Sequence, residues 1–371
     1  MSKVILKSVY KIYDDTVNAV QNFNLEVKDN EFIVLLGPSG CGKSTVLRMI
    51  AGLEEISSGK LYIDDKLCND LDPKDRDIAM VFQNYALYPH MTIYDNMAFG
   101  LKLRKLSKDE IDDRVYKTAE ILGISNLLDK NPKSLSIIQR QLVALGRAVV
   151  RNPKVFLLDD PLANLDSNLK SQMRAEIIRL HKNLNTTFIY VSHDQDEATQ
   201  MGNRIVVMKD GIIKQVDTPQ NLYENPCNDF VAGFIGTPSM NFIDATIIKE
   251  NNKYSLSFAD YKVSLPQGKN KDNVLESYID KEIILGIRPE ALQVNESADL
   301  KQSLDKFKAE VESTELTADN DTYLYLSVGK NSIISKVKSN TKVKSGNIID
   351  IYIDTTKIHI FDKDTGKAIL N

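Results

Sequence analysis

Hydrophobic and polar residues alternate along the first part of the chain, through about residue 30. The apolar members of this alternation are Val4, Leu6, Val9, Val20, Phe23, Leu25 and Val27. A period of two is typical of half-buried antiparallel strands, so we expect such strands here. A continuous apolar run follows at Phe32–Leu36, as in a strand that is buried on both faces.

Three later apolar runs share a feature, which is that polar residues follow directly after each of them. The runs are Ile78–Phe82, Val155–Leu158 and Phe188–Val191. The residues that follow them are Gln83, then Asp159 and Asp160, then Ser192 and His193. Ligands of open parallel α/β sheets bind at the carboxyl ends of the strands. We therefore expect these side chains to converge on one site, together with the residues after Phe32–Leu36.

The pattern becomes helical at Ser107 and changes again near residue 235. Ser107 and Glu110 predict a capping box at the start of a helix, and Gly123 is placed to end it. After residue 235, short alternating runs separated by turn residues predict a small β barrel or sandwich. The runs are Tyr254–Phe258, Ile283–Ile287, Tyr323–Val328, Ile349–Ile353 and Ile358–Phe361. The predicted domains are 1–235, with a helical subdomain at about 84–150, and 236–371.

The residues after the run Phe32–Leu36 read GPSGCGKST, and a helical pattern follows them. They match G-x-x-x-x-G-K-[ST] between a strand and a helix, the context in which this motif binds phosphate. Glycines let the backbone N–H groups point inward, and the helix N-terminus adds partial positive charge. The candidate nucleotide-binding residues are Gly37, Pro38, Ser39, Gly40, Cys41, Gly42, Lys43, Ser44 and Thr45. Lys43 would reach the β- and γ-phosphates of ATP, and the Ser44 hydroxyl would coordinate Mg²⁺.

Composition and charge exclude some classes of protein. No stretch approaches the roughly 20 apolar residues of a membrane-spanning helix, and the first residues lack the apolar core of a secretory signal. The cysteines Cys41, Cys68 and Cys227 are an odd number without metal-type spacing, which favours a reducing compartment. A net charge of −4 with dispersed lysines argues against nucleic acid as the main partner.

The chain resembles the ATPase subunits of ABC importers, and most closely those of the carbohydrate class. The segments that carry the resemblance are GPSGCGKST, VFQNYALYPHMT, LSIIQRQLVALGRA, VFLLDDPLANLD and VSHDQDEA. In the second half, GTPSMNF and GIRPEAL resemble segments of the same class. The resemblance implies an α/β P-loop ABC-type nucleotide-binding domain with a helical subdomain. A smaller all-β domain of the oligonucleotide-binding (OB/TOBE-like) type would follow it.

The resemblance assigns roles to single residues around the nucleotide. Tyr13 would stack on adenine, which its place upstream of the phosphate loop also favours over an ordinary surface or core aromatic. Asp159 would hold Mg²⁺, and Gln83 would sense Mg²⁺ and the attacking water. Asp160 stands at the position of the catalytic carboxylate, and His193 would be the γ-phosphate switch.

The resemblance also implies an assembly. Two copies would form a homodimer in which Ser136 and Gln139 of one copy face the ATP of the other. The loop Ala163–Asp166 would cross the dimer interface. Two integral membrane permease subunits would dock near Gln83–Thr92, where exposed aromatic residues favour a docking surface about as well as core packing. The chain would lie at the cytoplasmic face of the membrane, with a solute-binding protein acting indirectly and a regulatory protein possible at the C-terminal domain.

Two departures from the family pattern bear on turnover. Ile137 and Ile138 stand where the family has a glycine pair, and Leu142 stands where an arginine is common. Two branched side chains would obstruct the closed, ATP-bound dimer, because glycine there means close backbone approach to the phosphate. Asp160 replaces the usual glutamate, which withdraws the carboxylate by roughly 1.5 Å, and a misplacement of about 1 Å can cost on the order of 100-fold in rate. We therefore predict intact ATP binding and slow hydrolysis.

Three alternatives to a carbohydrate importer ATPase follow from the same residues. The first is a nucleotide-gated regulatory or degenerate subunit that binds ATP and turns over little, which both departures favour. The second is an importer ATPase for a non-sugar solute. The third is an ABC ATPase that acts on nucleic acid or ribosomes, and the acidic balance and the docking segment argue against it.

Overall fold

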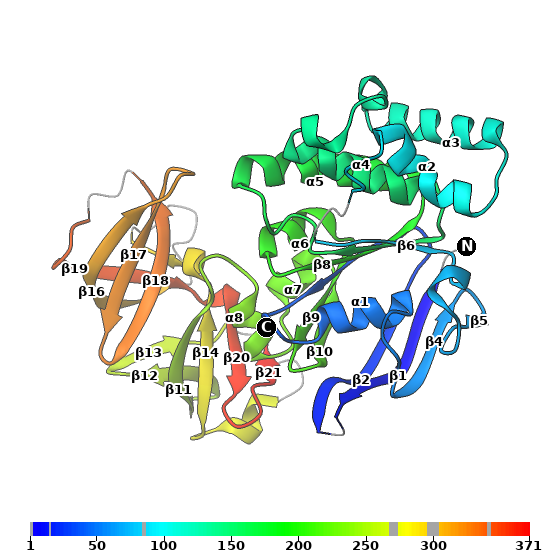
Figure 1. Cartoon of the computed structure of the whole chain (residues 1–371). Helices are drawn as coiled ribbons and strands as arrows, with labels where there is room; N and C mark the ends of the chain where they lie inside the picture. Colours follow the sequence, from blue (N-terminus) through cyan, green and yellow to red (C-terminus); the bar gives the residue numbers. More distant parts are fainter. Residues whose placement is uncertain (1–2, 15, 84–86, 267–273, 295–303, 340–342) are drawn as a thin grey trace. The chain divides into compact units, whose positions relative to one another are not determined.

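The computed structural model describes residues 3–14, 16–83, 87–266, 274–294, 304–339 and 343–371 (Figure 1). The chain divides into two compact units, Met1–Pro219 and Gln220–Asn371. The sequence predicts the boundary after residue 235 instead, because the pattern changes there from helical to alternating. Among the described residues, none of the helices has the length and apolar character needed to cross a lipid bilayer.

A six-stranded, mostly parallel sheet forms the centre of the first unit, in the order β10-β9-β3-β8-β7-β6. Its strands are β10 (Ile212–Asp217), β9 (Arg204–Lys209), β3 (Phe32–Leu36), β8 (Thr187–Ser192), β7 (Val155–Asp159) and β6 (Ile78–Val81). Only β10 runs antiparallel to its neighbour. The four apolar runs singled out in the sequence are therefore the four adjacent strands β3, β8, β7 and β6. They are parallel, as predicted.

A second, antiparallel sheet lies in the same unit. It has the order β2-β1-β4-β5, with β2 (Val17–Val27), β1 (Val4–Tyr13), β4 (Ser58–Ile63) and β5 (Lys66–Leu67). Helix α1 (Lys43–Ala51) contributes Val46, Leu47 and Ile50 to a core that it shares with apolar residues of both sheets. The helix after the phosphate loop is thus fixed on one side of the parallel sheet (Figure 1).

Three helices follow one another in the region predicted to be helical, and two more helices belong to the parallel sheet. The first three are α2 (Ile93–Leu103), α3 (Lys108–Ile121) and α4 (Ile137–Val149); the other two are α5 (Ser167–Leu184) and α6 (Gln195–Met201). The capping box predicted at α3 is wrong. The Ser107 hydroxyl accepts from the Glu110 N–H at 3.3 Å, but the Glu110 carboxylate pairs with Arg114 at 2.8 Å instead of returning to Ser107.

The second unit is almost entirely β structure. Among its described residues, the α-helices are α7 (Pro219–Glu224), which begins at the division between the units, and α8 (Asp229–Phe234). One sheet contains β13 (Tyr261–Ser264), β12 (Lys253–Phe258), β11 (Asn241–Glu250), β14 (Glu282–Ile287), β20 (Ile358–Asp362) and β21 (Ala368–Leu370), in that order. The other contains β15 (Leu292–Gln293), β19 (Ile348–Asp354), β16 (Leu304–Leu316), β17 (Asp321–Val328) and β18 (Asn331–Lys338), in that order. All five runs predicted from the sequence are strands.

The two sheets of the second unit share one apolar core, to which Leu285 of β14 and Phe307 of β16 both contribute. The Asn241 side chain also joins them, because its amide donates to the carbonyl oxygens of Ile287 at 3.1 Å and Ile334 at 2.8 Å. The predicted fold class, an α/β unit followed by a smaller all-β unit, is confirmed.

Candidate functional site

The phosphate loop connects β3 to α1 and depends on glycine at two tight positions. A Cβ atom at Gly37 would overlap the Met208 carbonyl oxygen and come within 2.7 Å of the Cys41 sulfur. Gly42 has a φ of 96° in the left-handed region, and a Cβ atom there would overlap the Ala19 carbonyl oxygen. The loop is thus held close to neighbouring backbone, with its N–H groups at the start of α1, which is the arrangement that binds phosphate.

Lys43, the first residue of α1, is buried, and its ammonium group lies over the loop. The Nζ atom donates to the carbonyl oxygens of Gly37 at 2.8 Å and Pro38 at 2.7 Å. The adjacent Cys41 thiol is buried too, and burial raises its pKa against the opposing effect of the Lys43 charge. Cys41 is therefore a neutral part of the loop wall, and Lys43 supplies its positive charge.

Ser44 and Asp159 meet at the carboxyl end of β7. The Ser44 Oγ atom donates to a carboxylate oxygen of Asp159 at 2.7 Å, although the two residues lie far apart in the sequence. A hydroxyl and a carboxylate are the hard oxygen ligands that Mg²⁺ takes in nucleotide sites, with phosphate oxygens and water completing its shell. The residues present fit a magnesium ion at this point, beside the phosphate loop.

Asp160 and His193 meet at the neighbouring strand ends. Asp160 Oδ2 lies 2.8 Å from His193 Nδ1, the exposed fractions of the two side chains being 20% and 50%. The backbone of Asp160 has a φ of 47°, and its N–H donates to the Val191 carbonyl at 3.1 Å. The other carboxylate oxygen, Oδ1, is buried without a hydrogen-bond partner among the described residues. Asp160 therefore keeps one acceptor oxygen unused beside His193.

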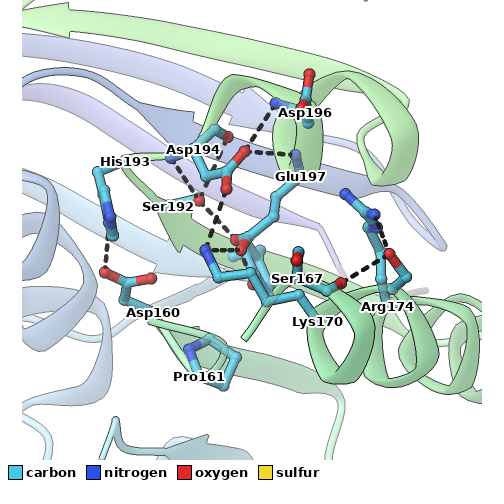
Figure 2. A network of polar contacts seen from close by, with 12 residues as sticks. Asp160, Pro161, Ser167, Lys170, Arg174, Ser192, His193, Asp194, Asp196 and Glu197 are labelled. Atoms are coloured by element: carbon cyan, nitrogen blue, oxygen red, sulfur yellow. Dashed lines mark hydrogen bonds and ion pairs between the residues drawn. The ribbon is translucent and has the colours of Figure 1, made fainter. Parts of the chain in front are cut away.

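A network of polar side chains supports the loop that carries His193 (Figure 2). Glu197 of α6 is almost completely buried, and its Oε2 atom accepts from Tyr190 at 2.9 Å and from Ser192 at 2.7 Å. Asp194 caps α6 by accepting the N–H groups of Asp196 and Glu197. Both residues next to His193 in the sequence are thus fixed by several hydrogen bonds.

Lys170 of α5 joins this network from a second helix. Its Nζ atom pairs with Asp194 at 3.1 Å and with Glu197 at 3.3 Å. Burial alone would lower the pKa of Lys170, but the two carboxylates outweigh it and raise the pKa. Burial would likewise raise the pKa of Asp194, but N–H groups of α6 and Lys170 together lower it. Burial, assisted by the Glu197 carboxylate, raises the pKa of Tyr190 well above its usual value. Lys170, Asp194 and Tyr190 thus each stay in one charge state at neutral pH.

Tyr13 ends β1 and is braced by a lysine. Lys11 Nζ lies 4.8 Å from the centre of the Tyr13 ring and pairs with Glu54 at 2.7 Å. Partial burial and the Glu54 carboxylate raise the pKa of the Tyr13 phenol. The ring is therefore neutral and oriented, as a stacking surface requires.

The predicted docking segment is described only in part. Gln83 is exposed beyond the end of β6, while Tyr85 lies outside the described residues. Leu87 and Pro89 line an open groove of about 470 Å³ together with Pro132, Lys133, Ile137, Arg140 and Asn164. The docking segment thus shares a groove with the first residue of α4, Ile137, whose exposed fraction is 43%.

Three residues predicted to face a second copy serve as helix caps within this chain. Ser136 and Gln139 form both halves of a capping box on α4, with distances of 3.2 Å and 3.0 Å. Asp166 caps α5 by accepting the Leu169 N–H at 2.9 Å. Two helix starts are thus well formed at the ends of exposed loops.

Sequence reasoning missed the residues that support the site. Lys170, Glu197 and Tyr190 were not singled out, and neither was Gln141 of α4, which donates to the Pro161 carbonyl at 2.6 Å. The sequence held one signal for Lys170. This residue lies four positions after the helix cap Asp166, which places it one turn into α5.

Comparison with known families gives two matches. Residues 20–163 match the model described as "ABC transporter", and residues 236–292 match "MalK OB fold domain". The second match lies within the all-β unit and confirms its predicted class.

Several curated proteins are similar to the chain over its whole length. The oligosaccharides import ATP-binding protein MsmX of Bacillus subtilis is 50% identical over 98% of this chain and 99% of its own. The trehalose/maltose import ATP-binding protein MalK of Thermococcus litoralis is 49% identical over 100% of both chains.

Among solved structures, the dimeric post-hydrolysis state of the ATP-binding cassette MJ0796 bound to ADP and Pi is 32% identical. It matches 58% of this chain and 98% of its own with a TM-score of 0.51. The structure of cbiO1 from Clostridium perfringens, part of an ABC transporter complex, is 31% identical with a TM-score of 0.56, over 59% of this chain and 89% of its own.

Proposed function

The chain belongs to the ATP-binding proteins of ABC transporters, and on that premise we propose that it is the energy-coupling subunit of a carbohydrate importer. The resemblance drawn from its sequence motifs is confirmed by the family match and by the relatives of nearly equal length. The names of two of those relatives concern oligosaccharides and trehalose or maltose, which supports a carbohydrate as the solute.

One observation carries the proposal, which is that four neighbouring strand ends gather the groups needed for ATP. In the register of the sheet, Leu36 lies beside Ser192, Val191 beside Asp159, and Leu158 beside Val81. The residues that follow these strands are therefore neighbours. Together they offer a phosphate loop with its lysine, the Ser44–Asp159 pair and the Asp160–His193 pair.

Each of these groups has a role in holding and cleaving ATP. The loop N–H groups and Lys43 would bind the β- and γ-phosphates, while Tyr13 would stack on adenine. Ser44 and Asp159 would hold Mg²⁺, and Gln83 would sense it; the ion would neutralise phosphate charge when bound. The Asp160 carboxylate would accept a proton from the attacking water. His193 would donate to the γ-phosphate from the ring nitrogen that Asp160 leaves free.

The proposal includes partners. A second copy of the chain would close over the bound ATP with the Ser136 and Gln139 helix start and the Asp166 loop. Two membrane permease subunits would dock at the groove lined by Leu87 and Pro89. The chain would lie on the cytoplasmic side of the membrane, and a solute-binding protein outside the cell would act through the permeases. A regulatory protein could use the all-β unit. Closure of the dimer would open the permeases outward, and hydrolysis would reset them.

A second candidate function has its own support, namely a subunit that binds ATP and hydrolyses it slowly. Ile137 is exposed at the first position of α4, where a second copy would have to approach, and Asp160 is one methylene shorter than the usual glutamate. Both features affect closure and chemistry but leave the binding groups in place.

Co-purification tests the proposal. The tagged chain is expressed in its own cell, crosslinked at the membrane, and isolated with ATP and Mg²⁺. Recovery of two integral membrane proteins, together with hydrolysis that rises when a sugar and its binding protein are added, is the expected result. Recovery of the chain alone with tightly bound ATP would favour the slow subunit. Recovery of ribosomal RNA would refute both.

A further inference from the structure

Lys170, which joins α5 to the His193 loop, is held at both its backbone and its side chain. Lys170 lies one turn into α5, and its backbone N–H donates to the Asp166 carbonyl at 2.8 Å. Asp166 ends the loop Ala163–Asp166 and caps the helix. The backbone of Lys170 is therefore anchored to the end of that loop, while its side chain reaches a different strand end.

The side chain of Lys170 contacts both sides of the His193 loop. Nζ pairs with Asp194, which follows His193 directly, and with Glu197, which holds Ser192 on the other side. Figure 2 shows the ammonium group beside the carboxylates of Asp194 and Glu197, with His193 and Asp160 to its left in the view. The exposed fraction of the Lys170 side chain is 20%, and that of Glu197 is 1%.

We propose that Lys170 is a positioning residue, which fixes the His193 loop against α5 and so keeps the His193 ring on Asp160. The inference rests on the proposed function where it takes His193 to face the γ-phosphate. Lys170 touches no reacting group itself. Its two ion pairs instead determine where Ser192 and Asp194 stand, and those residues leave the His193 backbone little freedom.

The physical reason for an effect on rate is geometric. Without the ammonium group, the buried Glu197 carboxylate loses the positive partner that it has among the described residues. The Asp194 carboxylate is then held by the N–H groups of α6 alone. A buried, unpaired carboxylate draws in water or a proton, and either change shifts its neighbour Ser192. A displacement of about 1 Å at a reacting group can cost on the order of 100-fold.

The test uses the whole chain with Lys170→Met, which keeps the length of the side chain and removes its charge. The conservative variant is Lys170→Arg, because a guanidinium can bridge the same two carboxylates. The matched control is Arg179→Met, which breaks an exposed ion pair with Glu176 on the same helix. ATP affinity is measured by calorimetry, and hydrolysis is followed under single-turnover conditions with protein in excess. That second assay reports even a slow chemical step.

We expect Lys170→Met to lower the hydrolysis rate by about 10- to 100-fold while ATP affinity changes by less than about twofold. Lys170→Arg keeps most of the rate, and Arg179→Met keeps all of it. A Lys170→Met chain with the parental rate would overturn the inference. So would equal losses of rate and affinity, or a Lys170→Arg chain as slow as Lys170→Met.

Two further results cover a variant that does not fold and separate this inference from the proposed function. If Lys170→Met does not fold, the double variant Lys170→Met with Glu197→Gln removes the charge of the buried Glu197 together with that of Lys170. The more exposed Asp194 carboxylate keeps its hydrogen bonds from the α6 N–H groups. The folded double variant is again expected to bind ATP and to hydrolyse it slowly, and a parental rate there would refute the role of Lys170. If the parent chain itself bound no ATP, the proposed function would fail, and this inference with it.

Discussion

Replacing Ile137 and Ile138 by glycine should make the chain less stable and yet more active. The helix start survives the change, because the Ser136 and Gln139 capping box does not involve the isoleucine side chains. Glycine in a helix costs about 0.5 to 1 kcal/mol per position, so the free energy of unfolding should fall by about 1 to 2 kcal/mol. For a unit of this size, that lowers the melting temperature by about 2 to 8 °C.

The gain in activity comes from closer approach of a second copy to the start of α4. Each N–H at the start of α4 that reaches a phosphate makes a charge-assisted hydrogen bond of about 1.5 to 3 kcal/mol. One such bond corresponds to roughly 10- to 100-fold in the affinity of the ATP-bound dimer. The first residue, Ile137, is exposed, so its removal sacrifices little buried surface.

Sedimentation in the presence of ATP measures the dimer, and steady-state phosphate release measures turnover. The matched control is Leu103→Gly, which places a glycine at the exposed end of α2 and should lower stability alone. A glycine pair that lowers the melting temperature but leaves dimer affinity and turnover unchanged would refute the steric reasoning.

Three further predictions concern the strand ends and the network behind them. Asp160→Glu should raise turnover by about 10- to 100-fold at unchanged ATP affinity. The left-handed backbone at this position costs the glutamate roughly 1 kcal/mol of stability. Steady-state assays on both chains test this prediction, and equal rates would contradict it. Ser44→Ala removes a hydroxyl from the Asp159 pair and should weaken Mg²⁺-dependent ATP binding by about 10-fold or more, whereas an unchanged Mg²⁺ dependence in calorimetry would exclude this site. Tyr190→Phe should alter alkaline unfolding: the pKa of Tyr190 is raised by folding, so above about pH 10 the unfolded phenol ionises while the folded phenol stays protonated, and stability falls. In denaturant titrations between about pH 9 and 11, the free energy of unfolding of Tyr190→Phe should fall with pH less steeply than that of the parent chain, by up to about 1.4 kcal/mol per pH unit. Parallel plots of unfolding free energy against pH for the two chains would argue against this prediction.

The central sheet could be predicted from the sequence because its strands have a simple local pattern. Each of β3, β6, β7 and β8 is a short apolar run that ends in polar residues, and parallel strands bring such ends together. The phosphate loop was equally readable, since its glycines are needed for backbone conformation and close approach.

Other strands and caps depended on context that the local pattern lacks. In β16 the apolar residues Phe307, Ala309 and Val311 alternate with lysines and glutamates, and the high charge conceals a strand that is half buried. At α3, the sequence S-x-x-E predicts a capping box, but Arg114 one turn later competes for the Glu110 carboxylate. The capping-box motif names only Ser107 and Glu110, so it does not weigh a competing arginine one turn later.

The support of the site could not be predicted, because its members come from different elements. Lys170 reads as an exposed helix lysine, and Glu197 reads as a first-turn acidic residue of α6. Only the packing of α5 beside α6 brings them within 3.3 Å of each other. Ion pairs between separate elements leave no periodic trace in a single sequence.

The most direct test of the whole account is equilibrium binding of ATP to the parent chain and to Lys43→Ala in the presence of Mg²⁺. The parent should bind ATP, and loss of the ammonium group over the loop should weaken binding by about 10- to 100-fold, the worth of one charged hydrogen bond. Lys60→Ala, at an exposed position in β4, is the control and should bind as the parent does. A parent chain that binds no ATP, or a Lys43→Ala chain that binds it equally well, would contradict the account.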